Sequence, residues 1–346
     1  MPRQLPILFI TRYAIRLSTF SNSLQEISCG NIPTLRTPEA LVSLILFLVG
    51  VTEPIMRLAI EHIRRMNGGS QAHLMRCDDG SYYVVKFKNN PQHLRTLANE
   101  MFATRVAARI GICVPQSDIV EVRSSLIENN PELMMEMPSR SFPCATGKQF
   151  GSKFPGNPLT MKIYGLMPDQ HLCAIHNIDD FLGIFIFDKW TCQTDRRQAI
   201  LVRQPNSSAN PECANGYQAM MIDQGFCFNG GNWNFPDAPL HSLYANRRVY
   251  QNVVGIESFD PWLDRLETGL SLSALYDEAL QVPPEWYGED HEAWERLIEH
   301  LYARRTRLRE LIWAARNAIP EAFPNWNKFI CPMSVTKAIS RANIVA

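Results

Sequence analysis

The stretch YVVKFK at 83–88 places lysines inside a strand, which limits the folds open to this chain. Its aromatic and β-branched residues are typical of strands, but Lys86 and Lys88 interrupt the apolar run. Because successive side chains of a strand point to opposite faces, the two lysines share one face. We therefore expect a strand with one face turned toward something other than a hydrophobic core.

The residues around this strand predict a small antiparallel sheet followed by a helix. LAIEHIRRM at 58–66 has strand character, NGGSQ at 67–71 follows as a glycine turn, and DDG at 78–80 is a hairpin signal before the lysine strand. Apolar residues then recur at helical spacing over 93–111, and Gly111 ends that helix.

The order of a glycine turn, a strand lysine and a helix glutamate is suited to binding phosphates. Backbone N–H groups of the 67–71 turn can approach phosphates without side-chain obstruction, Lys86 can reach the same groups, and Glu100 can orient the lysine. Each feature alone is common, since most such turns are hairpins and most helix glutamates are solvated. The three in this order indicate a nucleotide site of the kind found in protein-kinase-like folds.

The second half of the chain supplies carboxylates for phosphoryl transfer. Asp195 lies in a polar loop between the apolar helix predicted at 178–190 and a short strand. Asp223 directly follows the apolar strand predicted at 217–223 and precedes Gln224-Gly225, a position suited to holding a metal ion at a cleft floor.

The ordered set GGSQ, VVKF, NE, FDKWTCQTDRRQAILVR and MIDQG resembles the HipA-like kinases. That group belongs to the wider protein-kinase-like fold, with the HipA toxins, type II phosphatidylinositol 4-kinases and secreted Golgi kinases. The DxxxxxxDR register of 188–196 is similar to the catalytic loop of the lipid kinases, and IDQG to the metal-binding Asp-x-Gly of the family. The resemblance covers roughly residues 57–320.

The resemblance implies an α+β fold of two lobes, with a small antiparallel-sheet N-lobe and a mainly helical C-lobe, that uses ATP and Mg²⁺ to phosphorylate a hydroxyl. Lys86 would pair with the phosphates and Glu100, Asp195 would deprotonate the acceptor, and Asp223 would bind the metal. The connector near 136–150 would contact adenine. The remaining residues expected to bind the nucleotide are those of the glycine turn: Gly68, Gly69, Ser70 and Gln71.

One departure from the family pattern leaves an alternative open. These kinases usually carry an Asn a few residues after the catalytic Asp as a second metal ligand, and Gln198 is the nearest amide here. If Gln198 does not replace it, the chain is a pseudokinase or nucleotide-binding interaction module without transfer activity. A further alternative keeps the fold but transfers a nucleotidyl group.

The resemblance and composition predict five segments. Residues 1–55 are expected to be a weakly ordered extension, which translation from an upstream start codon would explain. Their apolar run at 40–51 is short for a bilayer span, so we expect no stable membrane insertion, with a membrane-associating hairpin as the minority alternative. The remaining expected segments are an N-lobe at 56–137, a connector or hinge at 138–160, a C-lobe at 161–325 and a tail at 326–346.

Composition restricts the partners and the compartment. Lysine plus arginine and aspartate plus glutamate both number 34, so no net charge attracts nucleic acid. The nine cysteines are scattered, with no CxxC pair, which favours reduced thiols in a cytoplasmic protein. The histidines show no zinc spacing. The expected partners are ATP and a hydroxyl acceptor, a protein or a small molecule, that the sequence does not identify.

Overall fold

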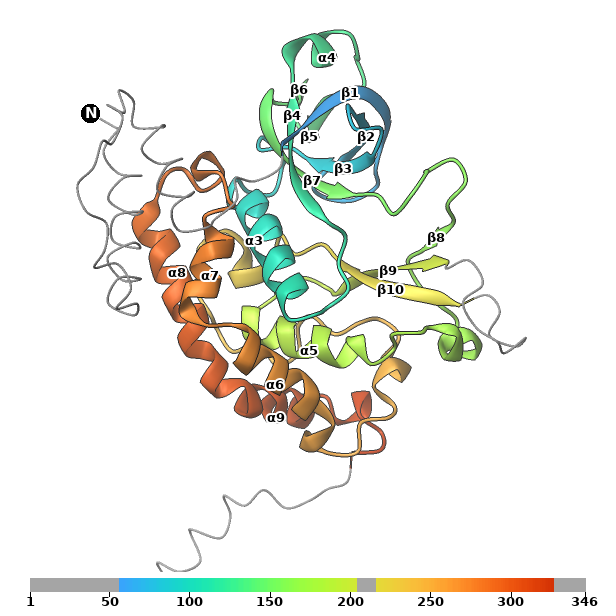
Figure 1. Ribbon diagram of the computed structural model, residues 1–346, viewed down its shortest axis with the longest axis vertical. Coiled ribbons are helices and arrows are strands. Elements are labelled where there is room, and N and C mark those ends of the chain that lie inside the picture. The colour runs from blue at the N-terminus through green and yellow to red at the C-terminus, as the bar shows by residue number, and fades with distance from the viewer. Residues whose placement is uncertain (1–55, 204–215, 327–346) are drawn as a thin grey trace, which may run out of the picture.

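The computed structural model describes residues 56–203 and 216–326. Five strands close into a barrel in the order β1-β2-β3-β7-β4. Helix α3 (Arg95–Arg109) lies between this barrel and the helices formed later in the chain (Figure 1). The barrel strands are β1 (Met56–Arg65), β2 (His73–Cys77), β3 (Tyr82–Lys86), β4 (Ser117–Val122) and β7 (Gly147–Lys153).

All strand contacts in the barrel are antiparallel except that between β1 and β4, which is parallel and closes the barrel. The sequence predicts an antiparallel sheet, and the parallel contact arises because α3 carries the chain across before β4 begins. Strand β1 also departs from simple alternation. Its register shifts between Ala59 and Glu61 and between His62 and Arg64, so its buried side chains do not follow a period of two.

Strand β3 explains why a lysine interrupts an apolar run. Tyr83 and Val85 are fully buried in the barrel core. Val84 and Lys86 alternate with them and line a cleft outside the barrel. The lysine face of this strand is therefore the wall of a cavity, and Lys88 lies beyond the strand end.

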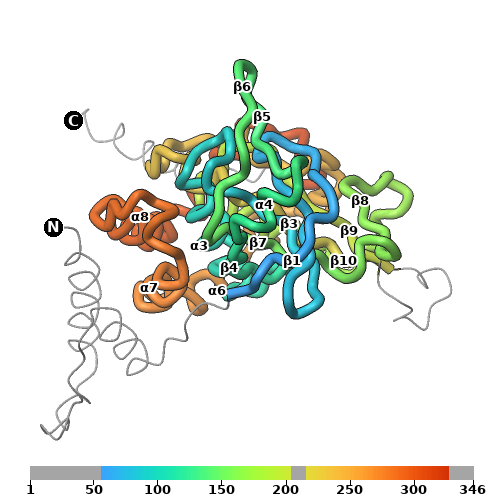
Figure 2. Tube along the Cα trace, turned by 90° about the horizontal axis from the view of Figure 1, so that it is seen from above, coloured from blue at the N-terminus to red at the C-terminus, as the bar shows by residue number. Residues whose placement is uncertain are grey.

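The structure places strands in the stretch 138–160, for which the sequence predicts a connector. Strand β7 lies within it and pairs with both β3 and β4. Gly151 is needed there because a Cβ would meet Val120 Cγ2 at 2.4 Å. The glycines and serines that favour a linker thus permit close strand packing, and the connector prediction is wrong for 147–153. Strands β5 (Met134–Met137) and β6 (Arg140–Pro143) form a hairpin that projects from the barrel (Figure 2).

The rest of the chain combines a three-stranded sheet with helices. Strands β8 (Ile163–Tyr164), β9 (Gln198–Arg203) and β10 (Tyr217–Ile222) pair in the order β10-β9-β8 below the barrel (Figure 1). The helices are α4 (Ser124–Glu128) in the barrel region, then α5 (Asp180–Thr191), α6 (Asp260–Gly269), α7 (Leu272–Ala279), α8 (His291–Arg304) and α9 (Leu308–Ala318).

The helical pattern at 291–319 gives two helices, where the sequence predicts one. The short 3-10 turn η7 (Arg305–Arg307) separates α8 from α9. Arg304 is buried just before this turn and contacts Asp237, so it is not part of a solvated arginine face. The turn allows α9 to pack against α5.

Helix α3 belongs to the core of the helical region, although it follows the barrel strands in sequence. Its apolar residues share one buried cluster with α5 and α8, whereas the barrel interior forms a second cluster. Phe102 on α3, for example, packs against Trp294 on α8 with ring centroids 5.2 Å apart. The expected extension at 1–55 and tail residues 327–346 lie outside the described residues. Within the described ranges, no helix has the length and apolar character to cross a membrane.

Candidate active site

The strand lysine, the helix glutamate and the strand-end aspartate meet at one point. Lys86 on β3 donates to Glu100 Oε1 on α3, and its Nζ lies 2.7 Å from Asp223 Oδ1, just after β10. Lys86 is 9% exposed and Glu100 is 2% exposed. The contact between Lys86 and Asp223 joins the barrel to the region that follows it through side chains 137 residues apart.

This ion-paired cluster fixes the charges at the cleft floor. Burial alone would lower the pKa of Lys86, but the carboxylates of Glu100 and Asp223 outweigh burial and raise it. Burial would raise the pKa of Asp223, but the Lys86 ammonium outweighs burial and lowers it. Lys86 is therefore charged and Asp223 ionised at neutral pH.

Asp223 is held in an unusual backbone conformation. Its φ is +66°, in the left-handed region that non-glycine residues rarely adopt, although Asp tolerates it better than most. Its carbonyl accepts hydrogen bonds from Gln193 Nε2 at 3.0 Å and from Arg197 Nη1 at 3.4 Å. Gln193 Oε1 also accepts from the backbone N–H of Asp195 at 3.3 Å, so this buried amide joins the two aspartate loops.

Arg197 is anchored by a buried ion pair that the sequence reasoning missed. Asp188 on α5 accepts from Arg197 Nε at 2.9 Å and Nη2 at 2.5 Å, and both side chains are fully buried. The same guanidinium donates to the Ile222 carbonyl at 2.6 Å. The available signal was an aspartate within an apolar helix, followed nine residues later by an arginine.

Asp195 and Gln198 lie at the same cleft. Asp195 belongs to the loop before β9, and Gln198 is the first residue of β9. Asp195 is exposed, lines the cleft and accepts from the N–H of Arg196 at 2.7 Å. Gln198 Nε2 donates to Asp223 Oδ2 at 2.6 Å. The structure therefore brings together Lys86, Asp195, Gln198 and Asp223, as the sequence predicts for a shared site.

The glycine turn forms the roof of the cleft, except for its last residue. Gly68, Gly69 and Ser70 line the cavity, and Gly68 has a φ of +135° that favours glycine. Gln71 does not reach it: its side-chain amide donates to the Glu136 carbonyl at 2.6 Å and accepts from the Glu136 N–H at 2.7 Å. Gln71 is expected to bind the nucleotide as part of the glycine turn, but the β5–β6 hairpin occupies both ends of its side-chain amide, so its side chain takes no part in the cleft.

The cleft has a volume of about 490 Å³, which is within the range of small-molecule sites. The apolar side chains that line it include Val84, Ile200 and Ile222, and the charged ones include Lys86, Glu100 and Asp223. The arrangement is suited to a ligand with a flat apolar part and an anionic part.

Helix α3 is fastened to the loop after Asp223 by Asn99, another residue that the sequence reasoning missed. Its fully buried Nδ2 donates to the carbonyls of Gly225, Cys227 and Gly230 at 2.9–3.1 Å, and its Oδ1 accepts from Trp233 Nε1 at 2.8 Å. The N–H of Gln224 also donates to Glu100 Oε2. Glu100 and the loop that follows Asp223 are thus held together by these buried hydrogen bonds.

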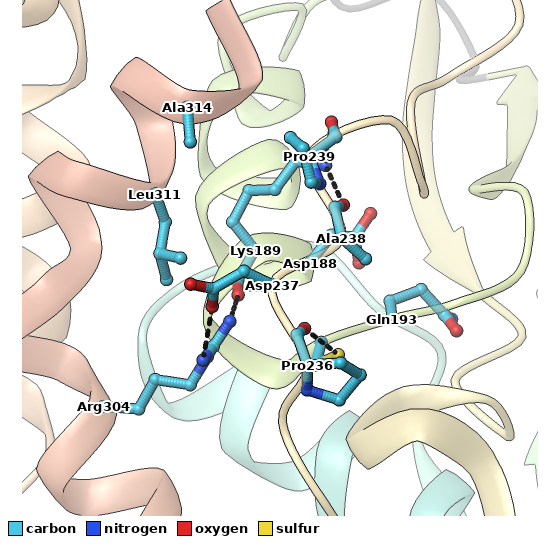
Figure 3. Close-up of a pocket in the computed structure, with 11 residues that line it drawn as sticks. Asp188, Lys189, Gln193, Pro236, Asp237, Ala238, Pro239, Arg304, Leu311 and Ala314 are labelled. Carbon is cyan, nitrogen blue, oxygen red and sulfur yellow. Dashed lines mark hydrogen bonds and ion pairs between the residues drawn. The ribbon is translucent and has the colours of Figure 1, made fainter. Parts of the chain in front are cut away.

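The segment that follows this loop is held against α5 and α8. Lys189 donates to the carbonyls of Pro239 at 3.0 Å and His241 at 2.6 Å. Arg304 pairs with Asp237 at 3.2 Å and donates to the Lys189 carbonyl (Figure 3). Burial lowers the pKa of Lys189 to about 8, against the opposing effect of Asp188.

The donor set fits a magnesium ion that is bound together with phosphates. Asp223 provides a carboxylate at the cleft, and Gln198 beside it has an amide oxygen that a turn of its side chain would present. Nowhere in 56–203 and 216–326 do three His, Cys, Asp or Glu side chains gather in a form that holds a metal. Mg²⁺ is often held by one or two carboxylates plus substrate phosphates, so this set suffices only with a bound nucleotide.

A family model described as HipA-like kinase matches residues 59–312. Among solved structures, the chain is similar to the Helicobacter pylori proinflammatory kinase CtkA at 11% identity and a TM-score of 0.42, over 74% of this chain and 99% of that chain. It is also similar to hydra Fam20 with sugar, at 11% identity and a TM-score of 0.44, over 82% of this chain and 91% of that chain. Similarity to the Golgi casein kinase with Mn/ADP bound is at 10% identity and a TM-score of 0.41, over 92% of this chain and 94% of that chain. A search of curated proteins finds no match. Because the family model spans well over half of its length, the chain belongs to the HipA-like kinase family, which confirms the resemblance.

Proposed function

We propose that this chain is an ATP-dependent kinase that transfers the γ-phosphoryl group to a hydroxyl acceptor with Mg²⁺. The observation that carries the proposal is the convergence of Lys86 and Asp223 on one cleft, from separate parts of the fold. The barrel then serves as an N-lobe and the helical region as a C-lobe, with the nucleotide between them. Belonging to a kinase family supports the same assignment.

The barrel residues bind and orient the phosphates. Backbone N–H groups of Gly68, Gly69 and Ser70 cover them, and Lys86 contacts them while Glu100 fixes its direction. Lys86 Nζ has three N–H donors, of which Glu100 and Asp223 take two, so one remains for a phosphate oxygen.

The helical region supplies the acid–base and metal-binding groups. Asp195 accepts the proton of the acceptor hydroxyl, since it is exposed at the cleft and its loop is fixed by Gln193. Asp223 and Gln198 would hold Mg²⁺, which would supply charge neutralisation to the phosphates. The chain's own contribution is positioning plus electrostatic stabilisation, with no covalent intermediate required.

The segment that reaches the base lies later than the sequence prediction of 136–150. Most of that range forms the β5–β6 hairpin and the start of β7. The chain leaves the barrel after Lys153, and Phe154, Pro155 and Pro158 line the cleft. We therefore assign the hinge to the residues that follow β7.

A pseudokinase is the second candidate, and one observation favours it. Gln198 turns its amide nitrogen toward Asp223, so the amide must rotate before its oxygen can meet a metal ion. A site with only one carboxylate directed at the metal could bind a nucleotide without transfer.

Six described cysteines are free thiols, which supports a cytoplasmic location. The acceptor is a protein or a small molecule.

The proposal is tested by incubating the chain with cell extract and γ-labelled ATP. Wild type is expected to label an acceptor. Asp223→Asn is expected to abolish labelling, because it keeps the shape and the backbone tolerance of Asp but removes the charge. Asp264→Asn, an exposed aspartate on α6, is the matched control and should label normally. Labelling from α-labelled ATP instead would indicate nucleotidyl transfer, and tight ATP binding with no labelling would favour the pseudokinase.

A further inference from the structure

Gly69, the second glycine of the glycine turn, is not required by its own backbone conformation. Its neighbour Gly68 has a φ of +135°, whereas the φ of Gly69 lies outside the left-handed region. The space beside it supplies the reason instead. A Cβ on residue 69 would stand 3.3 Å from Nε2 of Gln92, a tighter contact than is usual for a Cβ. Glycine at this position therefore leaves room for the end of the Gln92 side chain.

The backbone of Gln92 is fixed in the connection between β3 and α3. Asn90 Oδ1 accepts from the N–H of Gln92 at 2.9 Å, and Asn90 Nδ2 donates to the Phe87 carbonyl at 2.8 Å. An Asn side chain that bonds the backbone in this way stabilises a turn. From this turn the Gln92 side chain reaches the glycine turn and lines the cleft together with Lys86.

The side-chain amide of Gln92 has no internal partner at either end. Its Oε1 is buried without a hydrogen bond, and among the residues that the structure describes none accepts a hydrogen bond from its Nε2. A buried amide oxygen without a partner costs stability, and such groups are rare in native proteins. The Nε2 end lies beside the glycine turn, at the cleft, where a ligand can reach it. The amide is thus held at the cleft although no internal hydrogen bond holds it there.

We propose that Gln92 is a phosphate-binding residue of this cleft, whose Nε2 donates a hydrogen bond to the phosphate chain of the bound nucleotide. The inference rests on the proposed function and adds a residue to its nucleotide site. An amide N–H is a donor and a phosphate oxygen is an acceptor, so the two groups match. Lys86 has two of its three donors engaged by Glu100 and Asp223, whereas both N–H groups of the Gln92 amide are available. Gln92 therefore supplements the backbone N–H groups of the glycine turn.

This role predicts opposite effects of one substitution on stability and on binding. Gln92→Met keeps the length of the side chain and its packing against Gly69 but removes both polar ends. The fold loses an unpaired buried oxygen and should be at least as stable, while the nucleotide loses a hydrogen bond. A residue that serves only the fold would show the reverse: lower stability and unchanged ATP binding.

The experiment measures the Kd of ATP with Mg²⁺ by calorimetry and the urea midpoint of unfolding by circular dichroism. Gln92→Met should bind ATP about fivefold more weakly than wild type, as expected for one net hydrogen bond, with an equal or higher urea midpoint. Gln170→Met is the matched control, because it removes an exposed glutamine outside the cleft, and it should bind ATP as wild type does.

Two results would overturn the inference and leave the proposed function intact. One is an ATP affinity of Gln92→Met within about twofold of wild type. The other is weaker binding together with a lowered urea midpoint, because the loss would then follow from damage to the fold. If wild type itself does not bind ATP, the proposed function fails, and the inference with it.

A charged substitution tests whether the partner of Nε2 is an anion. Gln92→Glu keeps the shape of the side chain, but its carboxylate only accepts hydrogen bonds and repels phosphate. ATP should therefore bind to Gln92→Glu more weakly still than to Gln92→Met, at least about tenfold below wild type. Equal affinity of the Glu and Met variants would show that Nε2 does not face phosphate and would contradict the proposal.

Discussion

Replacing Asp188 by Asn tests whether the buried ion pair with Arg197 supports the candidate site. The substitution keeps the side-chain shape but leaves the guanidinium buried without its counter-ion, since both side chains are fully inaccessible. Removing one partner of such a pair typically costs about 3–5 kcal/mol. With a urea m-value of about 3 kcal/mol per M, a loss of about 4 kcal/mol lowers the unfolding midpoint by about 1.3 M.

Two further variants separate the ion pair from ordinary mutational damage. In Asp188→Leu with Arg197→Met, no buried charge is left unpaired, so the free energy of unfolding should return to within about 1 kcal/mol of wild type. Arg296→Gln removes an exposed ion pair with Glu292, at 3.4 Å, and should change the free energy of unfolding by less than about 0.5 kcal/mol. Urea titration followed by circular dichroism gives all of these values.

The double variant also tests the link to the site. It restores stability but removes the hydrogen bonds from Arg197 to the carbonyls of Ile222 and Asp223, so ATP binding with Mg²⁺ should stay weaker than in wild type. The reasoning is refuted if Asp188→Asn lies within 1 kcal/mol of wild type. It is also refuted if the double variant is no more stable than the single one.

Asn99→Leu should lower the free energy of unfolding by about 3 kcal/mol or more, because three buried carbonyls and one indole N–H lose their partner. A loss below about 1 kcal/mol, measured by urea titration, would contradict the role assigned to Asn99. His73→Gln should flatten the dependence of stability on pH between about 4 and 6.5. Burial lowers the pKa of His73 to about 4 from 6.5, so the unfolded chain binds more protons in this window and stability falls as pH drops, by up to about 3 kcal/mol. His171→Gln, an exposed histidine, is the control, and equal pH slopes for His73→Gln and wild type would exclude this role.

The parts of the site that local patterns encode could be predicted from the sequence. Lys86 stands out because it interrupts an apolar strand, and Asp223 because it ends one before glycine. Glu100 follows from the order of strand and helix. The structure places these three side chains in contact. Their positions could be predicted because each element is recognised from its own residues and a short connection.

The parts that depend on distant partners could not be predicted. Gln71 matches the phosphate turn by sequence, but its partner is the backbone of Glu136, 65 residues away. Gly151 favours a linker until Val120 is known to pack against it. Asn99 has the pattern of a helix-surface residue, and only the carbonyls of a loop more than 120 residues later explain its burial.

The helix at 291–319 shows a related limit. Amphipathic periodicity continues through 305–307, so the pattern contains no signal for the break between α8 and α9. The break depends on Arg304 turning inward to Asp237, which is a tertiary contact. Periodicity therefore gives the type of an element more reliably than its limits.

The most direct test of the central claim is calorimetric titration of wild type and Asp223→Asn with ATP, each with and without Mg²⁺. If Lys86 and Asp223 form one nucleotide and metal site, Mg²⁺ tightens ATP binding to wild type but not to Asp223→Asn, which still binds ATP alone through Lys86. Equal tightening by Mg²⁺ in both proteins would contradict the claim that Asp223 holds the metal.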